Sequence, residues 1–219
     1  MIDSAIGVVL RSQRHSETSL IVRWLTQDAG RVSTLAKGAR RPKSAFAGKL
    51  DLFAQAEFTF NRSARSDLHT LREVSVNEFH LPLREDVGRL QVVAYCTALL
   101  EQTTEIETPL PGLFELFSDL LGETAAGGAR PRLIFGFELK LLDALGLFPS
   151  LARTGLKPST RELVTVLAQG DWKTLRGLQP SPGSVNELNA FLHGFLIHHL
   201  GKIPKTRGSA LQGAGRKKP

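Results

Sequence analysis

Cysteine is nearly absent from this chain, since Cys96 is the only one among 219 residues. A single cysteine excludes an internal disulfide and any zinc site that needs several cysteine ligands, and it suits a reducing cytosol. Cys96 lies on the apolar stripe of a predicted helix, where a thiol fills a core more often than it acts as a nucleophile. We therefore expect neither a disulfide framework nor a metal site.

Long hydrophobic runs are also missing. No segment has the roughly 18 consecutive apolar residues that a transmembrane helix needs. Asp3 precedes any apolar stretch, whereas a signal peptide places basic residues before a hydrophobic segment. The sequence therefore predicts a soluble protein of the cytoplasm.

Recognisable catalytic motifs are missing as well. The sequence has no G-x-x-x-x-G-K-[ST] loop and no G-x-G-x-x-G after a strand, so neither of these phosphate-binding loops is predicted. His193, His198 and His199 cluster near the end of the last long predicted helix, but their spacing is not that of a zinc-binding H-x-x-x-H pair. Exposed or partly buried helix histidines are the simpler interpretation. We predict no catalytic residue, no cofactor and no metal ligand.

Acidic residues are absent between Asp28 and Asp51, and this gap holds the most informative segment of the chain. Residues 37–44, Lys-Gly-Ala-Arg-Arg-Pro-Lys-Ser, place four cations within seven positions. Gly38 and Pro42 interrupt any long helix, so we expect an exposed loop. Its ammonium and guanidinium groups can bridge phosphates, and arginine can do so bidentately. The alternative is a solvated charge run without a partner, because short basic runs are common.

Positive charge gathers at the two ends of the chain. The net charge of +7 favours an anionic partner such as a nucleic acid or a membrane surface. Residues 1–80 carry 12 Lys/Arg against 8 Asp/Glu, residues 81–198 carry 10 against 13, and residues 199–219 carry 6 against none. The anion-binding surface should therefore come from the terminal regions.

The first 80 residues have the pattern of a small β-domain. Ala56, Phe58 and Phe60 alternate with polar neighbours, and Trp24 lies in an apolar strand where a core position is expected. Five short strands separated by turns predict a small barrel or sandwich, and an OB-type barrel needs only five. The predicted strands are 5–10, 19–26, 31–36, 52–61 and 68–77.

The following 121 residues have a helical pattern, and we predict an α+β chain: a five-stranded OB-fold barrel over 1–80, an α-helical domain over 81–201 and a tail over 202–219. Apolar spacing predicts helices over 84–103, 113–121, 132–145 and 185–200, with residues 122–131 as a loop. Ser-x-x-Glu patterns at Ser159 and Ser184 predict two helix starts. The tail is polar, glycine-rich and basic, and is expected to be disordered.

Single-stranded nucleic acid is bound by cations that follow its backbone and by ring faces that stack on bases, at about 1–3 kcal/mol per base. Phe46, between Lys43 and Lys49, is the best stacking candidate, although it could equally tuck under the loop as a local staple. Four arginines lie near predicted strand ends and turns, where they extend such a groove or simply solubilise the surface: Arg11, Arg14, Arg62 and Arg65.

Several segments, in order and nearly end to end, resemble the RecO family of bacterial recombination-mediator proteins. One basic loop would be a weak signal, but several motifs in the same order are specific. Residues 36–44 are close to the most recognisable motif of the family. The other matching segments are 7–11, 20–26, 68–73, 135–149 and 202–207.

This resemblance implies an OB-fold joined to a helical domain, binding of single- and double-stranded DNA, and annealing of complementary strands without ATP. It also implies partnership with RecR and single-strand-binding protein during loading of RecA, and a cytoplasmic, nucleoid-associated location. Because single-strand-binding proteins present an acidic and apolar tail, it further implies a hydrophobic pocket edged by cations on the helical domain.

The same resemblance assigns DNA-contact roles to two sets of cations. One set falls on the matching basic motif: Lys37, Arg40, Arg41 and Lys43. The other falls less securely on the basic C-terminal segment: Lys202, Lys205 and Arg207.

The chain departs from the family in one respect. Many members carry a four-cysteine zinc module soon after the segment that matches 147–149, whereas residues 151–158 pass to the next helix without a cysteine. Either this member lacks zinc or the segment is missing from the chain, and we expect no metal.

Two alternatives to a DNA-annealing protein stay open. An RNA-binding OB-fold module of translation or the ribosome fits the same charge map, and competition between matched DNA and RNA oligonucleotides separates the two. An enzyme with an unrecognised site is the other alternative. Strand annealing without ATP or metal would make a hidden catalytic centre unnecessary.

Overall fold

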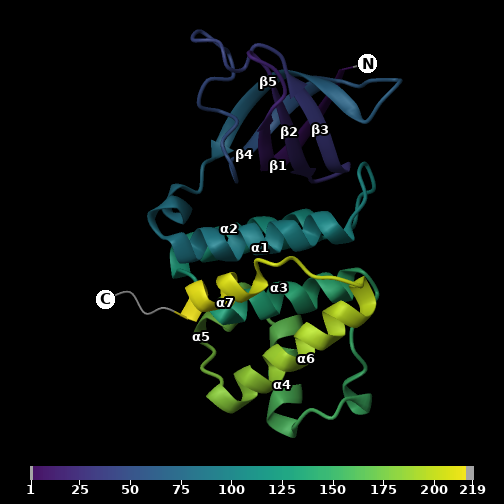
Figure 1. The fold of residues 1–219 in the computed structure, drawn as a ribbon, viewed down its shortest axis with the longest axis vertical. Helices are drawn as coiled ribbons and strands as arrows, with labels where there is room; N and C mark the ends of the chain where they lie inside the picture. Colours follow the sequence, from purple (N-terminus) through teal and green to yellow (C-terminus); the bar gives the residue numbers. More distant parts are fainter. Residues whose placement is uncertain (1, 216–219) are drawn as a thin grey trace. The chain divides into compact units, whose positions relative to one another are not determined.

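The computed structural model describes residues 2–215, and Figure 1 shows its elements. The chain forms two compact units. The first contains the residues up to His80 together with Thr104–Ser118, and the second contains Leu81–Thr103 and the described residues from Asp119 on. The expected boundary after residue 80 coincides with the first change of unit, but residues 104–118, expected in the helical domain, belong to the barrel unit.

The first unit is a closed barrel with the strand order β1-β2-β3-β5-β4. Neighbouring strands are antiparallel except β3 and β5, which are parallel, and the long strand β1 pairs with both β2 and β4. This arrangement confirms the predicted five-stranded OB-type barrel. The strands are β1 Ile2–Arg14, β2 Leu20–Thr26, β3 Gly30–Ala36, β4 Gln55–Asn61 and β5 Leu68–Glu78.

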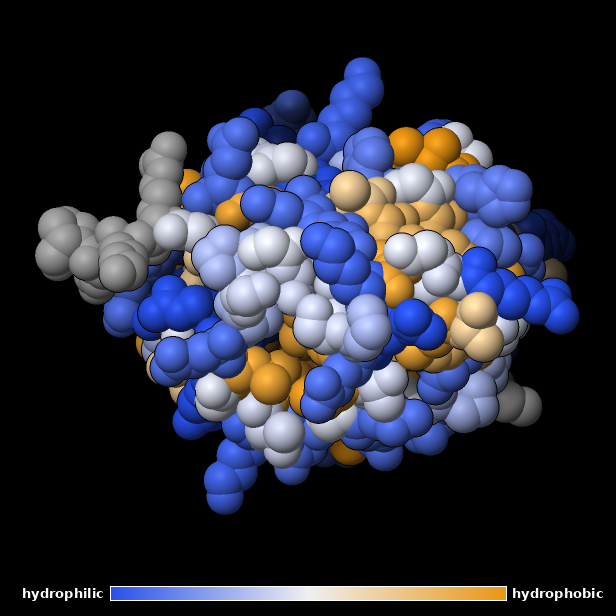
Figure 2. Space-filling model, turned by 90° about the horizontal axis from the view of Figure 1, so that it is seen from below, coloured by the Kyte–Doolittle hydropathy of each residue, from blue (hydrophilic) through white to orange (hydrophobic). Residues whose placement is uncertain are grey.

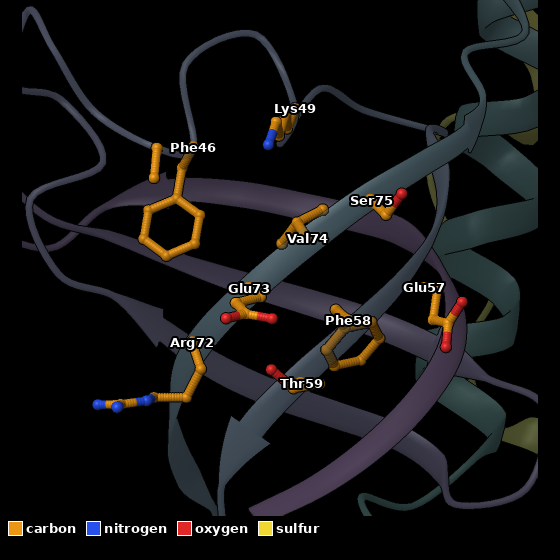
Figure 3. A pocket seen from close by; sticks show the side chains of 10 residues that line it. Phe46, Lys49, Glu57, Phe58, Thr59, Arg72, Glu73, Val74 and Ser75 are labelled. Atoms are coloured by element: carbon orange, nitrogen blue, oxygen red, sulfur yellow. The ribbon is translucent and has the colours of Figure 1, made fainter.

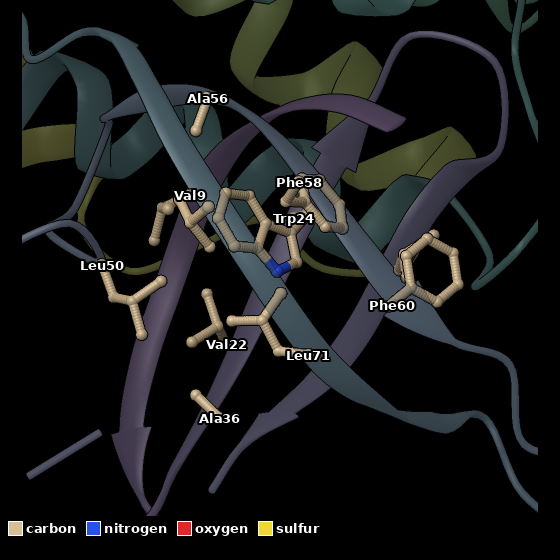
Figure 4. Close-up of a cluster of buried hydrophobic side chains, with 11 residues drawn as sticks. Val9, Val22, Trp24, Ala36, Leu50, Ala56, Phe58, Phe60 and Leu71 are labelled. Carbon is tan, nitrogen blue, oxygen red and sulfur yellow. The ribbon is translucent and has the colours of Figure 1, made fainter. Parts of the chain in front are cut away.

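The barrel core is built around Trp24, which is fully buried as predicted. Its indole ring stacks on Phe58 with ring centroids 4.1 Å apart, and its Nε1–H donates to Thr34 Oγ1 at 2.9 Å, so the polar end of the ring is satisfied. Figure 4 shows the surrounding side chains, which come from all five strands and from Leu50 in the β3–β4 connection. Alternate inward residues of the strands therefore supply the core, as the sequence pattern indicated.

The segment after Thr103 returns to the barrel and packs on the start of β3. The Glu107 amide donates to the Arg31 carbonyl at 2.8 Å. Gly30 has φ +67°, and a Cβ there would lie 2.5 Å from the Thr108 carbonyl oxygen, so only glycine fits both the conformation and the space. This close backbone approach explains why the segment belongs to the barrel unit.

The second unit is helical, and α3 forms its centre. All residues from Leu133 to Leu142 except Lys140 are buried, which is expected for a helix surrounded by others. Two short 3-10 helices also occur: η1 Leu81–Glu85 lies between β5 and α1, and η2 Leu151–Arg153 lies between α3 and α4. The α-helices of the described chain are α1 Val87–Thr103, α2 Leu113–Gly127, α3 Pro131–Ala144, α4 Pro158–Gln169, α5 Trp172–Gly177, α6 Pro182–Leu200 and α7 Arg207–Gly215, and the residues of α2 up to Ser118 belong to the first unit.

Three local predictions in the helical region were wrong. Helix α2 continues through Gly122 to Gly127, where a loop was expected. The N-caps of α4 and α6 are Lys157 and Ser181, each followed by proline at the first helical position, and not Ser159 and Ser184. Proline fixes φ for the first turn and lacks only an amide proton that has no partner there, so it moves each start upstream.

The expected disorder of the tail was wrong for Arg207–Gly215, which form α7. Ala210 and Ala214 are buried, and a Cβ added to Gly88 of α1 would lie 2.8 Å from the Gly213 carbonyl oxygen, so small residues let α7 approach α1 closely. Arg216, Lys217 and Lys218, also assigned to the tail, lie outside the described residues. In the part of the chain that the structure describes, no helix is long and apolar enough to cross a membrane.

Candidate nucleic-acid interface

The basic loop, residues 37–44, leaves the barrel where three strand ends meet. Arg14 at the end of β1 pairs with Leu20, and Leu20 pairs with Ala36, the last residue of β3. Lys37 follows directly, so Arg14 and the basic loop lie at the same end of the barrel. Arg14, Lys37, Arg41 and Lys43 are all exposed. This end of the barrel therefore gathers positive charge from two connections.

Arg40 holds the basic loop against the β1–β2 turn. Its backbone amide donates to the Thr18 carbonyl at 3.0 Å, and its Nη1 donates to the carbonyls of Ser16 and Glu17 at 3.1 and 2.8 Å. The side chain is nevertheless exposed. Arg40 consequently has a positioning role that the sequence did not reveal, in addition to its charge.

The other three cations of the basic loop are free of internal partners. Within residues 2–215, the side chains of Lys37, Arg41 and Lys43 make neither an ion pair nor a hydrogen bond. Successive turns shape the loop, with the Ser44 amide bonded to the Arg41 carbonyl at 3.1 Å. The charge of the loop is therefore presented to solvent, where it is available to phosphates.

The sequence left open whether Phe46 is accessible for stacking or tucks under the loop, and its position in the structure has features of both. It is half-buried and packs against the barrel core, yet it also lines an open groove of about 360 Å³. Its backbone amide donates to Ser44 Oγ at 3.2 Å, which fixes the turn that carries the ring. Figure 3 shows this "Phe46 groove", which the loop residues Ala45, Phe46 and Lys49 form together with β4 residues 57–59 and β5 residues 72–75.

A β-bulge supplies the polar wall of the Phe46 groove. Thr59 pairs with Glu73 and Phe60 pairs with Leu71, so Arg72 is an extra residue in β5. As a result, Arg72 and Glu73 are both exposed between buried Leu71 and Val74. Neither side chain has a partner among the described residues. Neither residue was predicted as part of a site: two consecutive polar residues in an alternating strand are compatible with a bulge, but the pairing with β4 decides whether one forms.

The remaining candidate arginines differ from one another. Arg11 is half-exposed and pairs with Arg23 across β1 and β2, and Arg65 is exposed in the β4–β5 turn. Arg62 instead contacts the carboxylates of Asp3, at 2.7 Å, and Glu107. The hydrogen bond to Asp3 raises the pKa of Arg62, and the hydrogen bond from His69 is the largest cause that lowers the pKa of Glu107. Arg62 thus fastens the segment after Thr103 to the barrel.

The C-terminal cations also divide into two kinds. Lys202 and Lys205 are exposed, and the Lys202 backbone carbonyl accepts from Gln102 Nε2 at 2.5 Å. Arg207 is only 5% exposed, and its Nε and Nη2 donate to the two oxygens of Glu138 at 2.7 and 3.0 Å. Its guanidinium is therefore not available to DNA, and the DNA-contact role expected for Arg207 does not fit the structure.

The side chains described by the structure do not support a metal site. Cys96 is fully buried in α1, and burial raises the pKa of its thiol, which opposes the thiolate that zinc requires. His193, His198 and His199 are exposed on α6, where His199 packs on Phe195 with ring centroids 4.3 Å apart. No three His, Cys, Asp or Glu side chains gather as a metal site in the described range. The residues do not fit the four-cysteine zinc module of the family.

The helical unit has a groove of about 280 Å³ between α4 and the start of α6. Leu163, Val166 and Leu178 give it an apolar lining, and Glu162 is the one charged residue that lines it. On the face seen in Figure 2, hydrophobic side chains form small patches separated by hydrophilic ones. No cation is among the described residues that line this groove, whereas the family resemblance implied a pocket edged by cations for an acidic tail.

Both parts of the chain match models of one protein family. Residues 1–79 match "Recombination protein O N terminal" and residues 84–156 match "Recombination protein O C terminal". Together the two matches cover more than half of the chain.

Curated relatives agree with these matches. The DNA repair protein RecO of Anaeromyxobacter sp. (strain K) is 37% identical over 145 residues, which are 66% of this chain and 57% of that protein. The DNA repair protein RecO of Listeria monocytogenes serotype 4b is 32% identical over 150 residues, which are 68% of this chain and 58% of that protein. The chain thus spans less than two thirds of the length of these relatives.

Proposed function

Because the chain belongs to the RecO family, we propose that it binds single- and double-stranded DNA in repair and recombination and anneals complementary strands without ATP. The observation that carries the proposal is the basic loop, whose Lys37, Arg41 and Lys43 are exposed and unpaired within the described residues. Ala45 and Phe46, which follow the basic loop directly in the sequence, line the Phe46 groove, and Phe46 offers an aromatic ring for stacking. Cations and an accessible ring are the two requirements for sequence-tolerant binding of single strands.

Annealing follows from charge neutralisation. Two complementary strands repel each other through their phosphates, and cations that replace condensed counterions lower this repulsion while the bases remain free to pair. Duplex formation is itself favourable, so no nucleotide hydrolysis is required. Lys37, Arg40, Arg41 and Lys43 would contact one strand, and Lys202 and Lys205 provide a second basic surface.

The salt dependence of DNA binding tests the role of the basic loop. Replacing Lys37, Arg40, Arg41 and Lys43 by Gln should weaken binding to single strands of any sequence and reduce the log–log salt slope by about 3, since each single-strand phosphate contact contributes about 0.7. Because Arg40 also fastens the loop, a triple variant that keeps it should lose a slope of about 2. Fluorescence anisotropy over a salt series measures both slopes.

A charge-matched control separates a contact site from net charge. Gln at four exposed cations of the helical unit, Arg130, Arg153, Lys157 and Lys173, removes the same charge. This control should keep the salt slope. An equal slope in the wild type and in both loop variants would dismiss the basic loop as the DNA contact.

Family membership also supports a wider role with partner proteins. We extend the proposal to partnership with RecR and single-strand-binding protein and, through them, to loading of RecA. Added to RecA and to DNA coated by single-strand-binding protein, the chain together with RecR should shorten the lag in RecA filament formation. An unchanged lag would confine the proposal to DNA binding and annealing.

RNA binding is the alternative that the same cations allow. Competition between a DNA and an RNA oligonucleotide of one sequence decides between them, because the two differ at the 2′-hydroxyl and in the pyrimidine methyl group. A clear preference for RNA would favour the translation-associated module.

A further inference from the structure

We propose that the Phe46 groove is a pocket for one unpaired base, and that Glu73 makes it prefer bases with an exocyclic amino group to thymine. The inference rests on the proposed function, since it gives base preference to a surface proposed to bind single strands. The volume of the Phe46 groove, about 360 Å³, falls at the lower end of the roughly 300–1,000 Å³ typical of small-ligand sites.

The walls of the Phe46 groove supply the three kinds of contact that a nucleotide needs. Phe46 offers a ring for stacking, and its turn is fixed by Ser44. Lys49 and Arg72 lie at the sides, where they can contact the phosphates that flank the base. Glu73 lies between Phe46 and the β4 residue Thr59 in Figure 3. A base stacked on Phe46 would therefore present its edge toward Glu73.

The position of Glu73 is the feature that phosphate binding alone does not explain. An exposed carboxylate beside Lys49 and Arg72 repels phosphates, and it forms no ion pair with either cation among the described residues. The β-bulge turns Arg72 and Glu73 outward together, whereas a regular strand would turn one of them inward. A carboxylate in this place can instead accept hydrogen bonds from N–H groups of a base.

The chemistry of the bases gives the direction of the preference. Cytosine, adenine and guanine each carry an amino group that donates to a carboxylate, whereas the one ring donor of thymine, N3–H, lies between two carbonyl oxygens that repel a carboxylate. Glu57 also lines the groove, but Figure 3 places it at the far side from Phe46. Glu73 is therefore the residue assigned to base selection, and Phe46 stacks on any base.

Oligonucleotides that differ only in a few bases test the proposal. We expect the wild-type chain to bind a thymine 12-mer with cytosines at alternate positions about fivefold more tightly than an all-thymine 12-mer, at the lower end of known base discrimination because the groove is open. Glu73→Gln should abolish the preference, since an amide can donate to thymine as well as accept from cytosine. Anisotropy at one salt concentration measures both affinities.

Two further variants separate base selection from charge and stacking. Glu115→Gln removes the same charge from an exposed position of the barrel unit and should keep the fivefold preference. Phe46→Leu should weaken binding to both oligonucleotides by a similar factor. A Glu73→Gln variant that keeps the preference would overturn the assignment of Glu73.

The same titrations distinguish failure of this inference from failure of the proposed function. Equal wild-type affinity for the two 12-mers, together with a steep salt slope, would overturn the base pocket and leave DNA binding intact. Absence of measurable binding to either oligonucleotide would overturn both. A fivefold preference that Glu73→Gln removes and Glu115→Gln retains would establish the pocket.

Discussion

Single arginines in the two basic segments have opposite roles, although their sequence contexts look alike. Arg40 is exposed and fastens the basic loop through backbone carbonyls, whereas Arg207 is buried and pairs with Glu138. The Glu138 carboxylate, which is fully buried, also accepts from the Tyr95 hydroxyl at 2.5 Å, and Arg207 Nη1 donates to Asn189 at 2.7 Å. This network joins α1, α3, α6 and α7, so Arg207 is a structural residue.

Replacing Arg207 should therefore affect stability more than DNA binding. Arg207→Met leaves the buried Glu138 carboxylate without its cation, and loss of one partner of a buried ion pair costs about 3–5 kcal/mol of unfolding free energy. Urea denaturation followed by circular dichroism measures the loss. Lys205→Met, at an exposed position of the same segment, should change stability by less than about 0.5 kcal/mol.

A double variant sharpens this prediction. Glu138→Gln combined with Arg207→Met removes the buried charge and should recover part of the lost stability. A single Arg207→Met variant that keeps full stability but loses salt-dependent DNA binding would contradict the structural role.

Elements with a strong periodic pattern could be predicted from the sequence, because burial imposes the period directly. Phe58 and Phe60 of β4 point into the barrel core as their alternation indicated, and α3 coincides with its predicted range within one residue at each end. The alternation does not determine irregularities, which depend on the partner strand. The bulge at Arg72 is one such case, because it exists only in the pairing of β4 with β5.

Composition was a weaker guide where packing decides the outcome. The segment of α7 is rich in glycine and alanine and has little helix-forming pattern of its own, and the ion pair with Glu138 and the contact with α1 stabilise it. In the candidate nucleic-acid interface, too, the part that depends on packing could not be predicted from composition. The basic loop was recognisable because exposed charge needs no partner, whereas the Phe46 groove combines residues from three separate segments and could not be predicted from their spacing.

Replacing a helix glycine by alanine should have opposite effects on stability at two positions, because Gly88 of α1 contacts α7 closely and Gly122 of α2 has open space. Gly88→Ala places a Cβ 2.8 Å from the Gly213 carbonyl oxygen, so α7 must shift, and overpacking of this kind costs about 1–3 kcal/mol. Gly122→Ala lies inside α2 with open space around its Cβ, and it should stabilise the chain by about 0.5–1 kcal/mol. Thermal unfolding of the two variants measures both signs, and a stabilised Gly88→Ala variant would contradict the close approach.

At the scale of the whole molecule, the distribution of charge matters more than its sum. The net charge is +7, yet the residues between 81 and 198 carry more acidic than basic side chains. Positive surface therefore comes from the basic loop in one unit and from Lys202 and Lys205 in the other. The proposed annealing requires two strands to be neutralised together, so two separate basic surfaces would suit it better than one.

Removing the second basic surface should therefore separate annealing from binding. Lys202→Gln with Lys205→Gln should leave single-strand binding through the basic loop largely intact, with a salt slope lower by at most about 1.4 for two lost contacts. The rate of annealing of complementary strands, without ATP and with a chelator present, should fall by roughly tenfold because electrostatic steering of the second strand is lost. Fluorescence quenching between labelled complementary strands measures that rate.

Lys157→Gln with Lys173→Gln removes the same charge from other exposed positions and should keep the wild-type annealing rate. If the two double variants anneal equally fast, the basic loop alone accounts for the reaction, and the C-terminal lysines have no part in it.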